Sequence, residues 1–422
     1  MAVDLSVNFC GLRFKNPVLT ASCELAENRR GVRKSLESGV GGVVTKTITT
    51  VPYQRQRTTP ARWMLTRADP KVSVQSMGWP GLSSLSPEEW LTEELPVVQI
   101  LCAEAGAQLI VSTASDSPEE WAALSASIVE AGVKMLELNL SCPVTRWSSK
   151  GKGTDRTPAS DPEVAYSVVE MVKKAVGETP VMPKLSPLLG GVEEIARACK
   201  EAGADAIAGC NGYRGLLIDV EKEEPFGPPF VSGFSPGRVF KPLSLAVMAQ
   251  VAMAVDLPLS GIGGINEGRD ALEYMLLGCT TVQVAKAALY SGRQVFPKIL
   301  KGIAEFMEKK GYSSIDEFRG KVGKQLVYPA DYPSFVTGLG KAPEVRPVME
   351  VEKCNGCGIC VLRCTYGAWT QEVKKGIPKL DDSLCDSCGT CVSSCLPGAL
   401  CLQDRRGNVI WTGRGASRPW PD

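Results

Sequence analysis

The chain has 422 residues, and its 47 lysines and arginines nearly balance its 46 aspartates and glutamates, which leaves a formal net charge of +1 at pH 7. Because no long run of one sign occurs, nothing predicts a nucleic-acid groove or a polybasic membrane patch. Histidine is absent, which excludes imidazole as an acid, base or metal ligand and with it most hydrolase mechanisms.

No stretch approaches the roughly 20 apolar residues of a membrane helix. The start, MAVDLSVNFC, lacks the charged and apolar regions of a signal peptide. We therefore expect a cytoplasmic protein without a membrane or nucleic-acid partner. In such a protein the 16 cysteines are expected to serve as metal ligands rather than as disulfides.

Eight short apolar runs alternate with amphipathic stretches over the first three quarters of the chain. They start at Val18, Gly42, Gln108, Met135, Val181, Ala206, Leu257 and Thr281. Their continuous hydrophobicity is typical of strands buried on both faces, and segments such as PEEWAALSASIVEAG have helix periodicity. Eight such units over roughly 250 to 300 residues predict an α/β fold, the (β/α)₈ TIM barrel. The alternative, a doubly wound sheet, usually has a glycine fingerprint after its first strand, and VLTASCELAENRRG has none.

Polar residues and glycines follow several of these runs, at the end of a barrel where active sites form. They are Lys46, Thr47, Asn139, Ser141, Lys184, Asn211, Gly263 and Gly264. The two glycines follow the seventh run, where barrels of this type bind a phosphate. The sequence therefore predicts a binding site assembled from several strand ends.

A segment rich in glycine and proline, GLGKAPEVRPV, separates the barrel from a cysteine-rich module and is typical of a linker. We predict a barrel domain over residues 1–337, a linker over 338–347, a ferredoxin-like module over 348–404 and a C-terminal tail over 405–422. The tail is expected either to be loosely ordered or to form a strap on the barrel.

Eight cysteines of this module form two runs with the spacing C-x2-C-x2-C-x3-C. In two-cluster ferredoxins three cysteines of one run and the fourth of the other hold each four-iron cluster. We thus predict two [4Fe-4S] clusters, the first on Cys354, Cys357, Cys360 and Cys395 and the second on Cys385, Cys388, Cys391 and Cys364. Zinc is the alternative, because C-x2-C pairs also bind zinc, but the duplicated tight spacing favours iron and sulfur.

Two clusters transfer single electrons over a distance, so the barrel is expected to bind a group that accepts electrons singly and uses them in pairs. A flavin does this. Together with the glycines after the seventh run, this predicts flavin mononucleotide (FMN).

Several segments of the chain resemble a known family. They are FKNPVLTAS, GGVVTKTIT, QSMGWPGL, LELNLSCP, PKLSP, SGIGGI and VQVAKA. These segments are similar to the flavin domain of dihydroorotate dehydrogenases. With the two-cluster module, the similarity extends to the iron–sulfur subunits of bacterial NAD-dependent dihydropyrimidine dehydrogenases and covers the chain from about Leu5 to Cys395.

The resemblance implies a set of cofactor-binding residues. Those expected near the flavin ring are Ala21, Ser22, Lys46, Thr47, Gln75, Asn139, Lys184 and Asn211. Those expected at the phosphate are Gly237, Gly263, Gly264, Ala285 and Lys286. Lys184 matches a lysine at the N1 and O2 edge of the flavin, where a cation stabilises the negative charge of the reduced ring.

The resemblance also implies substrate-binding residues, which are Gln75, Asn139, Ser141 and Asn211. Amides suit the carbonyl and ring-nitrogen edge of a pyrimidine. The chain departs from the family pattern where Gln75 replaces an asparagine, Val144 replaces the asparagine of SCPN, and Gly212 replaces a hydroxyl residue.

The loop after SCP supplies a proton-donating cysteine or serine in this family. Here that loop, VTRWSSKGKGTDRTPAS, contains no cysteine. Thr157 lies nearest the equivalent point, with Asp155 and Ser160 as neighbours. We expect Asp155 and Thr157, with Lys46 and Lys184, to be the catalytic residues.

The expected function is that of a flavin and iron–sulfur oxidoreductase acting on a conjugated carbon–carbon double bond, with a pyrimidine base as the leading substrate. One alternative keeps the cofactors and changes the substrate to another unsaturated cyclic or carbonyl-conjugated compound. Another is an electron-transfer subunit without chemistry of its own. No segment fits a dinucleotide fingerprint, so we expect a flavoprotein partner subunit that oxidises NAD(P)H, or a ferredoxin, and an oligomeric assembly.

Overall fold

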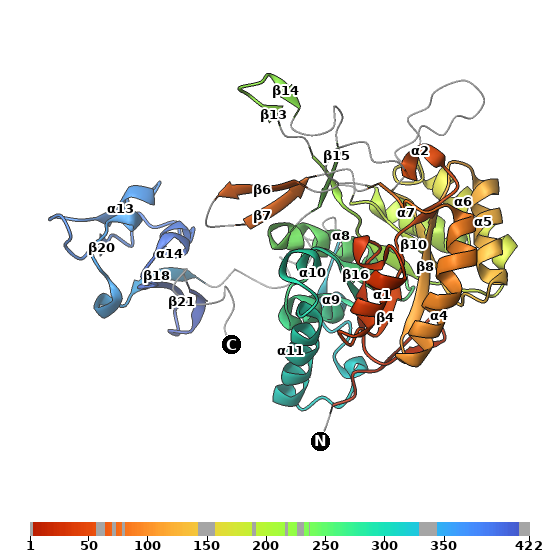
Figure 1. Ribbon diagram of the computed structural model, residues 1–422. Helices are drawn as coiled ribbons and strands as arrows, with labels where there is room; N and C mark the ends of the chain where they lie inside the picture. Colours follow the sequence, from red (N-terminus) through yellow and green to blue (C-terminus); the bar gives the residue numbers. More distant parts are fainter. Residues whose placement is uncertain are drawn as a thin grey trace. The chain divides into compact units, whose positions relative to one another are not determined.

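The computed structural model divides the chain into two compact units, Met1–Leu326 and Val327–Asp422. It describes residues 3–55, 64–69, 73–77, 81–141, 157–187, 191–215, 218–225, 232–235, 237–328 and 344–412. The first unit is the predicted barrel and the second contains the cysteine runs (Figure 1).

Eight parallel strands close into a barrel in the order β4-β3-β17-β16-β11-β10-β9-β8, and β8 pairs back onto β4. The strands are β3 (Val18–Thr20), β4 (Gly42–Val44), β8 (Gln108–Ala114), β9 (Leu136–Asn139), β10 (Val181–Lys184), β11 (Ile207–Gly209), β16 (Leu259–Ile262) and β17 (Cys279–Val284). These are the eight apolar runs, so the predicted (β/α)₈ barrel is confirmed. A short strand, β5 (Ile48–Thr49), continues the pairing of β4 along β8.

Helices surround the barrel on its outside (Figure 1). They are α1 (Arg29–Leu36), α4 (Leu95–Glu104), α5 (Pro118–Glu130), α6 (Pro162–Val176), α7 (Val192–Glu201), α8 (Lys241–Ala254), α9 (Gly268–Leu277), α10 (Lys286–Ser291) and α11 (Val295–Lys310). Local sequence sets their starts, because Ser117 and Asp161 accept backbone N–H bonds at the starts of α5 and α6, each followed by a proline. None of the described helices is long and apolar enough to cross a membrane.

Two inserted segments form additional strands beyond the carboxyl ends of β4 and β11. An antiparallel sheet has the order β12-β15-β7-β6, with strands β6 (Met64–Asp69), β7 (Ser73–Met77), β12 (Tyr213–Gly215) and β15 (Ser232–Ser235). A hairpin follows β12 and consists of β13 (Ile218–Asp219) and β14 (Glu224–Pro225). The sheet joins segments far apart in sequence at the end of the barrel where the polar strand ends lie.

The second unit contains a small sheet and two short helices. Strands β18 (Val345–Met349), β21 (Leu400–Asp404) and β22 (Val409–Thr412) form the sheet, and α13 (Ile359–Arg363) and α14 (Thr390–Ser394) each begin within a cysteine run. A two-stranded pair, β19 (Trp369–Thr370) and β20 (Lys379–Leu380), lies between the runs. Strand β18 begins inside the segment expected to be a linker, and β22 lies in the segment expected to be a tail. The pairing of β22 with β21 makes those residues part of this unit.

Candidate functional site

A connected set of polar side chains lies at the carboxyl ends of neighbouring barrel strands. The hydroxyl Oγ1 of Thr47 is 3.0 Å from the hydroxyls of both Ser22 and Ser112, and it accepts a hydrogen bond from Nδ2 of Asn139 at 3.1 Å. The amide oxygen of Asn139 in turn accepts from Nδ2 of Asn211 at 2.7 Å. Five of the residues that line this end of the barrel are thus joined by direct hydrogen bonds. Ser112 is one that sequence reasoning missed.

Lys184, at the end of β10, is buried beside a carboxylate that the sequence analysis did not single out. Its ammonium lies 3.4 Å from Oε1 of Glu137, whose side chain is 0% exposed. Ser112 and Gln283 donate to the two oxygens of Glu137 at 3.1 and 3.0 Å. A buried carboxylate with its hydrogen bonds satisfied is the partner that a buried ammonium requires. The signal was available in LELN, because Glu137 and Asn139 lie two residues apart on a strand and share a face.

Lys46 follows β4 and forms an ion pair of 2.9 Å with Glu24, which lies in the loop after β3. Lys286 is close to this pair. Burial lowers the pKa of Lys286 to about 7, although Glu24 and Cys23 oppose the shift. Burial acts to raise the pKa of Glu24, but the charge and hydrogen bond of Lys46 lower it further, so the carboxylate is ionised at neutral pH. Three adjacent strands, β4, β3 and β17, therefore bring two lysines and one carboxylate together.

The two glycines after β16 have left-handed backbone conformations, with φ of +123° for Gly263 and +67° for Gly264. A Cβ atom on Gly263 would lie 2.4 Å from Oγ of Ser244, and one on Gly264 would lie 2.6 Å from Cβ of Lys241. Only glycine fits these positions without a shift of α8. Strand β16 pairs with β17 in parallel, so this loop lies next to Ala285 and Lys286 at the end of β17. Gly237 directly precedes a 3₁₀ turn at Arg238–Phe240 that leads into α8.

The chemistry of this donor set fits a flavin. The isoalloxazine ring presents alternating carbonyl oxygens and ring nitrogens, and buried ammonium groups, amides and hydroxyls are the donors and acceptors that such an edge needs. Lys46 and Lys184 are each 4% exposed, so either ammonium would act on a bound ring with little screening by solvent.

The residues expected to bind substrate and supply a proton are only partly described. Asn139 and Asn211 bond each other, and Oγ of Ser141 is 2.9 Å from Oγ of Ser186. The backbone of Gln75 belongs to β7, but its side chain lies outside the described residues, as does the whole of Asp155. Thr157 is 8% exposed, and its hydroxyl lies 3.0 Å from that of Ser160. The proposed acid thus stays a prediction.

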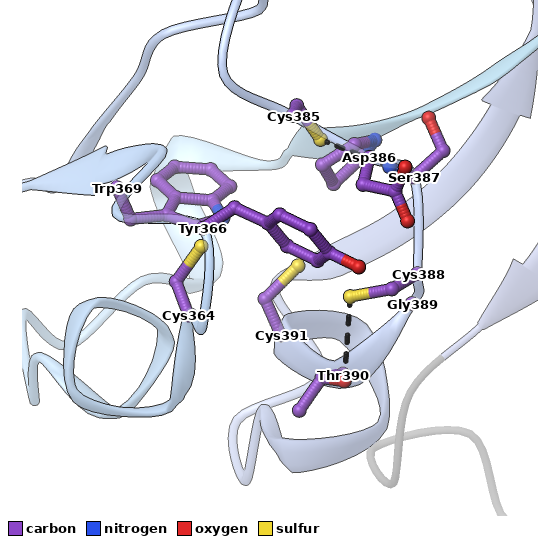
Figure 2. Close-up of a pocket in the computed structure, with 11 residues that line it drawn as sticks. Cys364, Tyr366, Trp369, Cys385, Asp386, Ser387, Cys388, Gly389, Thr390 and Cys391 are labelled. Carbon is purple, nitrogen blue, oxygen red and sulfur yellow. Dashed lines mark hydrogen bonds between the residues drawn. The ribbon is translucent and has the colours of Figure 1, made fainter.

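In the second unit, four cysteines of the two runs line a single cavity (Figure 2). Three of them, Cys385, Cys388 and Cys391, come from the second run, and Cys364 comes from the first. This is the set that the crossed ferredoxin arrangement requires. We call it the second cluster site, and we call Cys354, Cys357, Cys360 and Cys395 the first cluster site. The assignment of a cluster to each stays a prediction.

Backbone amides point at the sulfurs of both cluster sites. The N–H of Ala368 donates to Sγ of Cys364 at 3.3 Å, and that of Ala399 donates to Sγ of Cys395 at 3.2 Å. Such bonds stabilise thiolates, the form that binds metal. In the part of the chain that the structure describes, no three cysteine, aspartate or glutamate side chains gather closely enough to hold a single metal ion. Sulfurs spread around a cavity suit a polynuclear cluster better than one zinc ion.

Comparison with known proteins identifies both units. The family model described as dihydroorotate dehydrogenase matches residues 4–307. A model described as a 4Fe-4S dicluster domain matches residues 353–400.

Two kinds of relative share this sequence. The NAD-dependent dihydropyrimidine dehydrogenase subunit PreA of Escherichia coli (strain K12) is 29% identical over 386 residues, which cover 88% of this chain and 89% of that protein. The catalytic subunit of dihydroorotate dehydrogenase B (NAD(+)) from Methanothermobacter thermautotrophicus is 32% identical and covers 75% of this chain and 97% of its own length. The same subunit from Thermococcus kodakarensis is 33% identical with the same coverage.

Proposed function

The chain belongs to the dihydroorotate dehydrogenase family and carries a 4Fe-4S dicluster domain, and on this premise we propose that it interconverts a pyrimidine base, uracil or thymine, and its dihydro form. Membership of this family makes it a flavin and iron–sulfur oxidoreductase. The alignment with the dihydropyrimidine dehydrogenase subunit carries the choice of substrate. It covers 88% of this chain, which is more residues than the barrel unit contains, so it includes part of the cysteine-rich unit.

The paired asparagines support a pyrimidine as the substrate. Asn139 and Asn211 come from different strands, and their amides lie within 2.7 Å of each other. Each amide offers both a donor and an acceptor, as the carbonyl and ring-nitrogen edge of a pyrimidine does. Binding would exchange the bond between the two asparagines for bonds to the ring, so little polar capacity is left unsatisfied in either state.

The buried lysines have an electrostatic role in this proposal. Flavin mononucleotide, when bound, supplies hydride exchange with the carbon–carbon double bond. Lys184 holds positive charge beside that position, and Glu137 keeps its ammonium in place at 3.4 Å. Lys46 is held in the same way by Glu24 at 2.9 Å. Fixed charges in a site with little water stabilise developing negative charge without reorganisation.

The loop after β9 is proposed to supply a proton. A carboxyl that loses water when the loop covers the substrate has a raised pKa and becomes an acid. Asp155 is our candidate for this group. Thr157 is the nearest hydroxyl by sequence position and already bonds Ser160 at 3.0 Å, so it is suited to hold the loop and to orient the acid.

We propose that each cluster site holds one [4Fe-4S] cluster, which gives about eight irons and one FMN per chain, and that the electrons come from outside this chain. The relatives are named as subunits and as NAD-dependent, which supports a separate flavoprotein partner that oxidises NAD(P)H. A ferredoxin is the alternative donor. The purified chain is therefore expected not to oxidise NADH or NADPH rapidly by itself.

Dihydroorotate is the second candidate substrate. The barrel is 32% to 33% identical to dihydroorotate dehydrogenase B catalytic subunits, slightly more than to the dihydropyrimidine enzyme. A different unsaturated compound, or electron transfer without chemistry at the barrel, would leave both pyrimidines and orotate unreactive.

The test is anoxic flavin spectroscopy of the full chain. Dihydrouracil, dihydrothymine and dihydroorotate are each mixed with the oxidised protein, and uracil, thymine and orotate are each mixed with the reduced protein, while flavin absorbance is followed. We expect rapid change with the uracil or thymine pair. Reaction with the orotate pair alone would favour the second candidate, and reaction with neither would refute both.

A variant makes the same test specific for the site. Asn211→Ala removes one amide of the asparagine pair and should abolish the response to uracil while the flavin stays bound. Ser127→Ala is a matched control, because Ser127 lies on the exposed side of α5 and bonds only the carbonyl of Ala123 in its own helix. If Asn211→Ala reacted like the unchanged protein, the asparagines would not be the substrate site.

A further inference from the structure

The two cysteine runs end in different sequences at matching positions. After its fourth cysteine the first run reads CTYGAW, and the second reads CLPGAL. Tyr366 therefore corresponds to Pro397, and Trp369 corresponds to Leu400. In each of these two pairs one residue has an N–H group that the other lacks, since proline has no backbone N–H and leucine no side-chain donor.

The first difference concerns the fourth cysteine of each site. Burial acts to raise the pKa of Cys364, but hydrogen bonds from the backbone N–H groups of Ala368, Tyr366, Trp369 and Gly367 lower it. At Cys395 the bond from Ala399 is present at 3.2 Å, yet Pro397 cannot donate where Tyr366 does. The sulfur of Cys364 therefore has an amide donor that Cys395 lacks by sequence.

The second difference concerns the third cysteine of a run. Burial raises the pKa of Cys391, and a hydrogen bond from the side chain of Trp369 opposes that rise. Figure 2 shows the indole of Trp369 in the cavity that Cys391 and Cys364 line. Leu400 is the counterpart of Trp369 in the other run and has no N–H to offer. Both differences thus favour the second cluster site.

Further contacts act at the same site. The backbone N–H of Ser387 donates to Sγ of Cys385 at 3.4 Å, and the sulfur of Cys388 lies 3.4 Å from Oγ1 of Thr390. Two charges act in the opposite direction. Asp386 lines the cavity of the second site, and Arg363 donates to Ser394 beside Cys395 at 3.1 Å. Both Asp386 and Arg363 are exposed, so water and salt screen them, whereas the N–H groups touch the sulfurs directly.

We propose that the two clusters are unequal and that the cluster held by Cys385, Cys388, Cys391 and Cys364 has the higher reduction potential. Hydrogen bonds to cluster sulfurs stabilise the extra negative charge of the reduced state, and they are among the features that set cluster potentials. When a one-electron reductant supplies a single electron to the module, that electron resides at the second site. The inference depends on the proposed pair of clusters but not on the substrate.

The experiment is a reductive titration of the anoxically purified full chain with dithionite and redox mediators, followed by electron paramagnetic resonance. Two one-electron transitions at different potentials are expected. Trp369→Phe removes the indole N–H and keeps an aromatic ring, and Tyr366→Pro removes the backbone N–H. Each should lower only the transition at higher potential, by up to about tenfold in the ratio of reduced to oxidised cluster, which is about 59 mV for one electron.

Two further variants provide the control and the reverse test. Tyr366→Phe keeps the backbone N–H and removes only the hydroxyl, so both potentials should stay unchanged. Pro397→Tyr adds an N–H at the first site and should raise the lower potential, narrowing the gap.

The outcomes separate this inference from the cofactor proposal. Iron well below eight per chain would overturn the pair of clusters and this inference together. Eight irons with equal potentials would overturn only the inference, as would a Trp369→Phe variant that lowers the transition at lower potential. If Tyr366→Pro fails to fold, Trp369→Phe and Pro397→Tyr still decide the result.

Discussion

The barrel and the cysteine-rich unit assemble their sites in opposite ways. In the barrel, the bond between Asn139 and Asn211 joins residues 72 positions apart, and Gln283 reaches Glu137 across 146 positions. In the cysteine-rich unit, all eight candidate ligands lie between Cys354 and Cys395. Closure of the barrel creates the first site, whereas local spacing already specifies most of the second.

The two sites also balance charge differently. Each buried lysine in the barrel faces a carboxylate, as Lys184 faces Glu137 and Lys46 faces Glu24. The cysteine sulfurs face backbone N–H groups instead. Side-chain substitutions should therefore disturb the electrostatics of the barrel, while in the cysteine-rich unit the largest effects should come from replacing a ligand.

Replacing one ligand gives the largest expected effect and tests whether the two sites are independent. Cys354→Ser should lower the iron from about eight to about four per chain and leave the flavin in place, because the iron and flavin sites belong to different compact units. Iron analysis and flavin absorbance after anoxic purification measure both. Cys199→Ser, at a buried barrel cysteine on α7, is the control and should keep all the iron. Loss of flavin in Cys354→Ser would contradict the independence.

Breaking a buried charge pair tests the electrostatic description of the barrel. Glu137→Gln leaves the ammonium of Lys184 buried without its carboxylate and should lower the free energy of unfolding by about 3–5 kcal/mol. Urea unfolding of the flavin-free barrel, followed by tryptophan fluorescence, measures the loss. The double variant Glu137→Gln with Lys184→Met should recover part of it, because no unpaired charge remains. An unchanged single variant would show that the pair contributes little.

Removing the proposed acid tests the loop after β9. Asp155→Asn should slow turnover of the true substrate by about a hundredfold or more, with unchanged flavin content, because a positioned acid contributes roughly that factor. Thr157→Ala should have a smaller effect and Ser160→Ala little. Turnover assays with the partner or an artificial donor measure all three. If Asp155→Asn and Thr157→Ala both kept full turnover, the proton would come from solvent or from another group.

The pH dependence of stability gives the smallest expected effect. Burial lowers the pKa of Lys286 from 10.5 to about 7 in the folded protein. Between these values the unfolded chain binds more protons, so this lysine makes the free energy of unfolding rise with pH. From pH 7 to 9 the rise should be about 1–2 kcal/mol larger in the unchanged protein than in Lys286→Met. Urea titrations of the flavin-free protein at both pH values measure it, and equal slopes would contradict the burial of a neutral lysine.

Much of the architecture was predictable from local patterns. Strands covered on both faces must be apolar throughout, so the eight barrel strands could be recognised as continuous apolar runs. The cysteine runs predicted a dicluster domain, because the ligand spacing itself is the signal. Strand β22 was harder, since VIWT follows RRGN in a segment without long periodicity, and only its pairing with β21 places it in the sheet.

The lysines and asparagines at the strand ends could be found from the sequence, because each directly follows an apolar run. Their partners could not. Glu24 lies after β3 and Glu137 lies inside β9, and nothing near them in sequence indicates that they face Lys46 and Lys184. The pairing depends on which strands are neighbours and on their register in the closed barrel. That register is a balance of contacts made all round the barrel, so no single segment of the chain contains it.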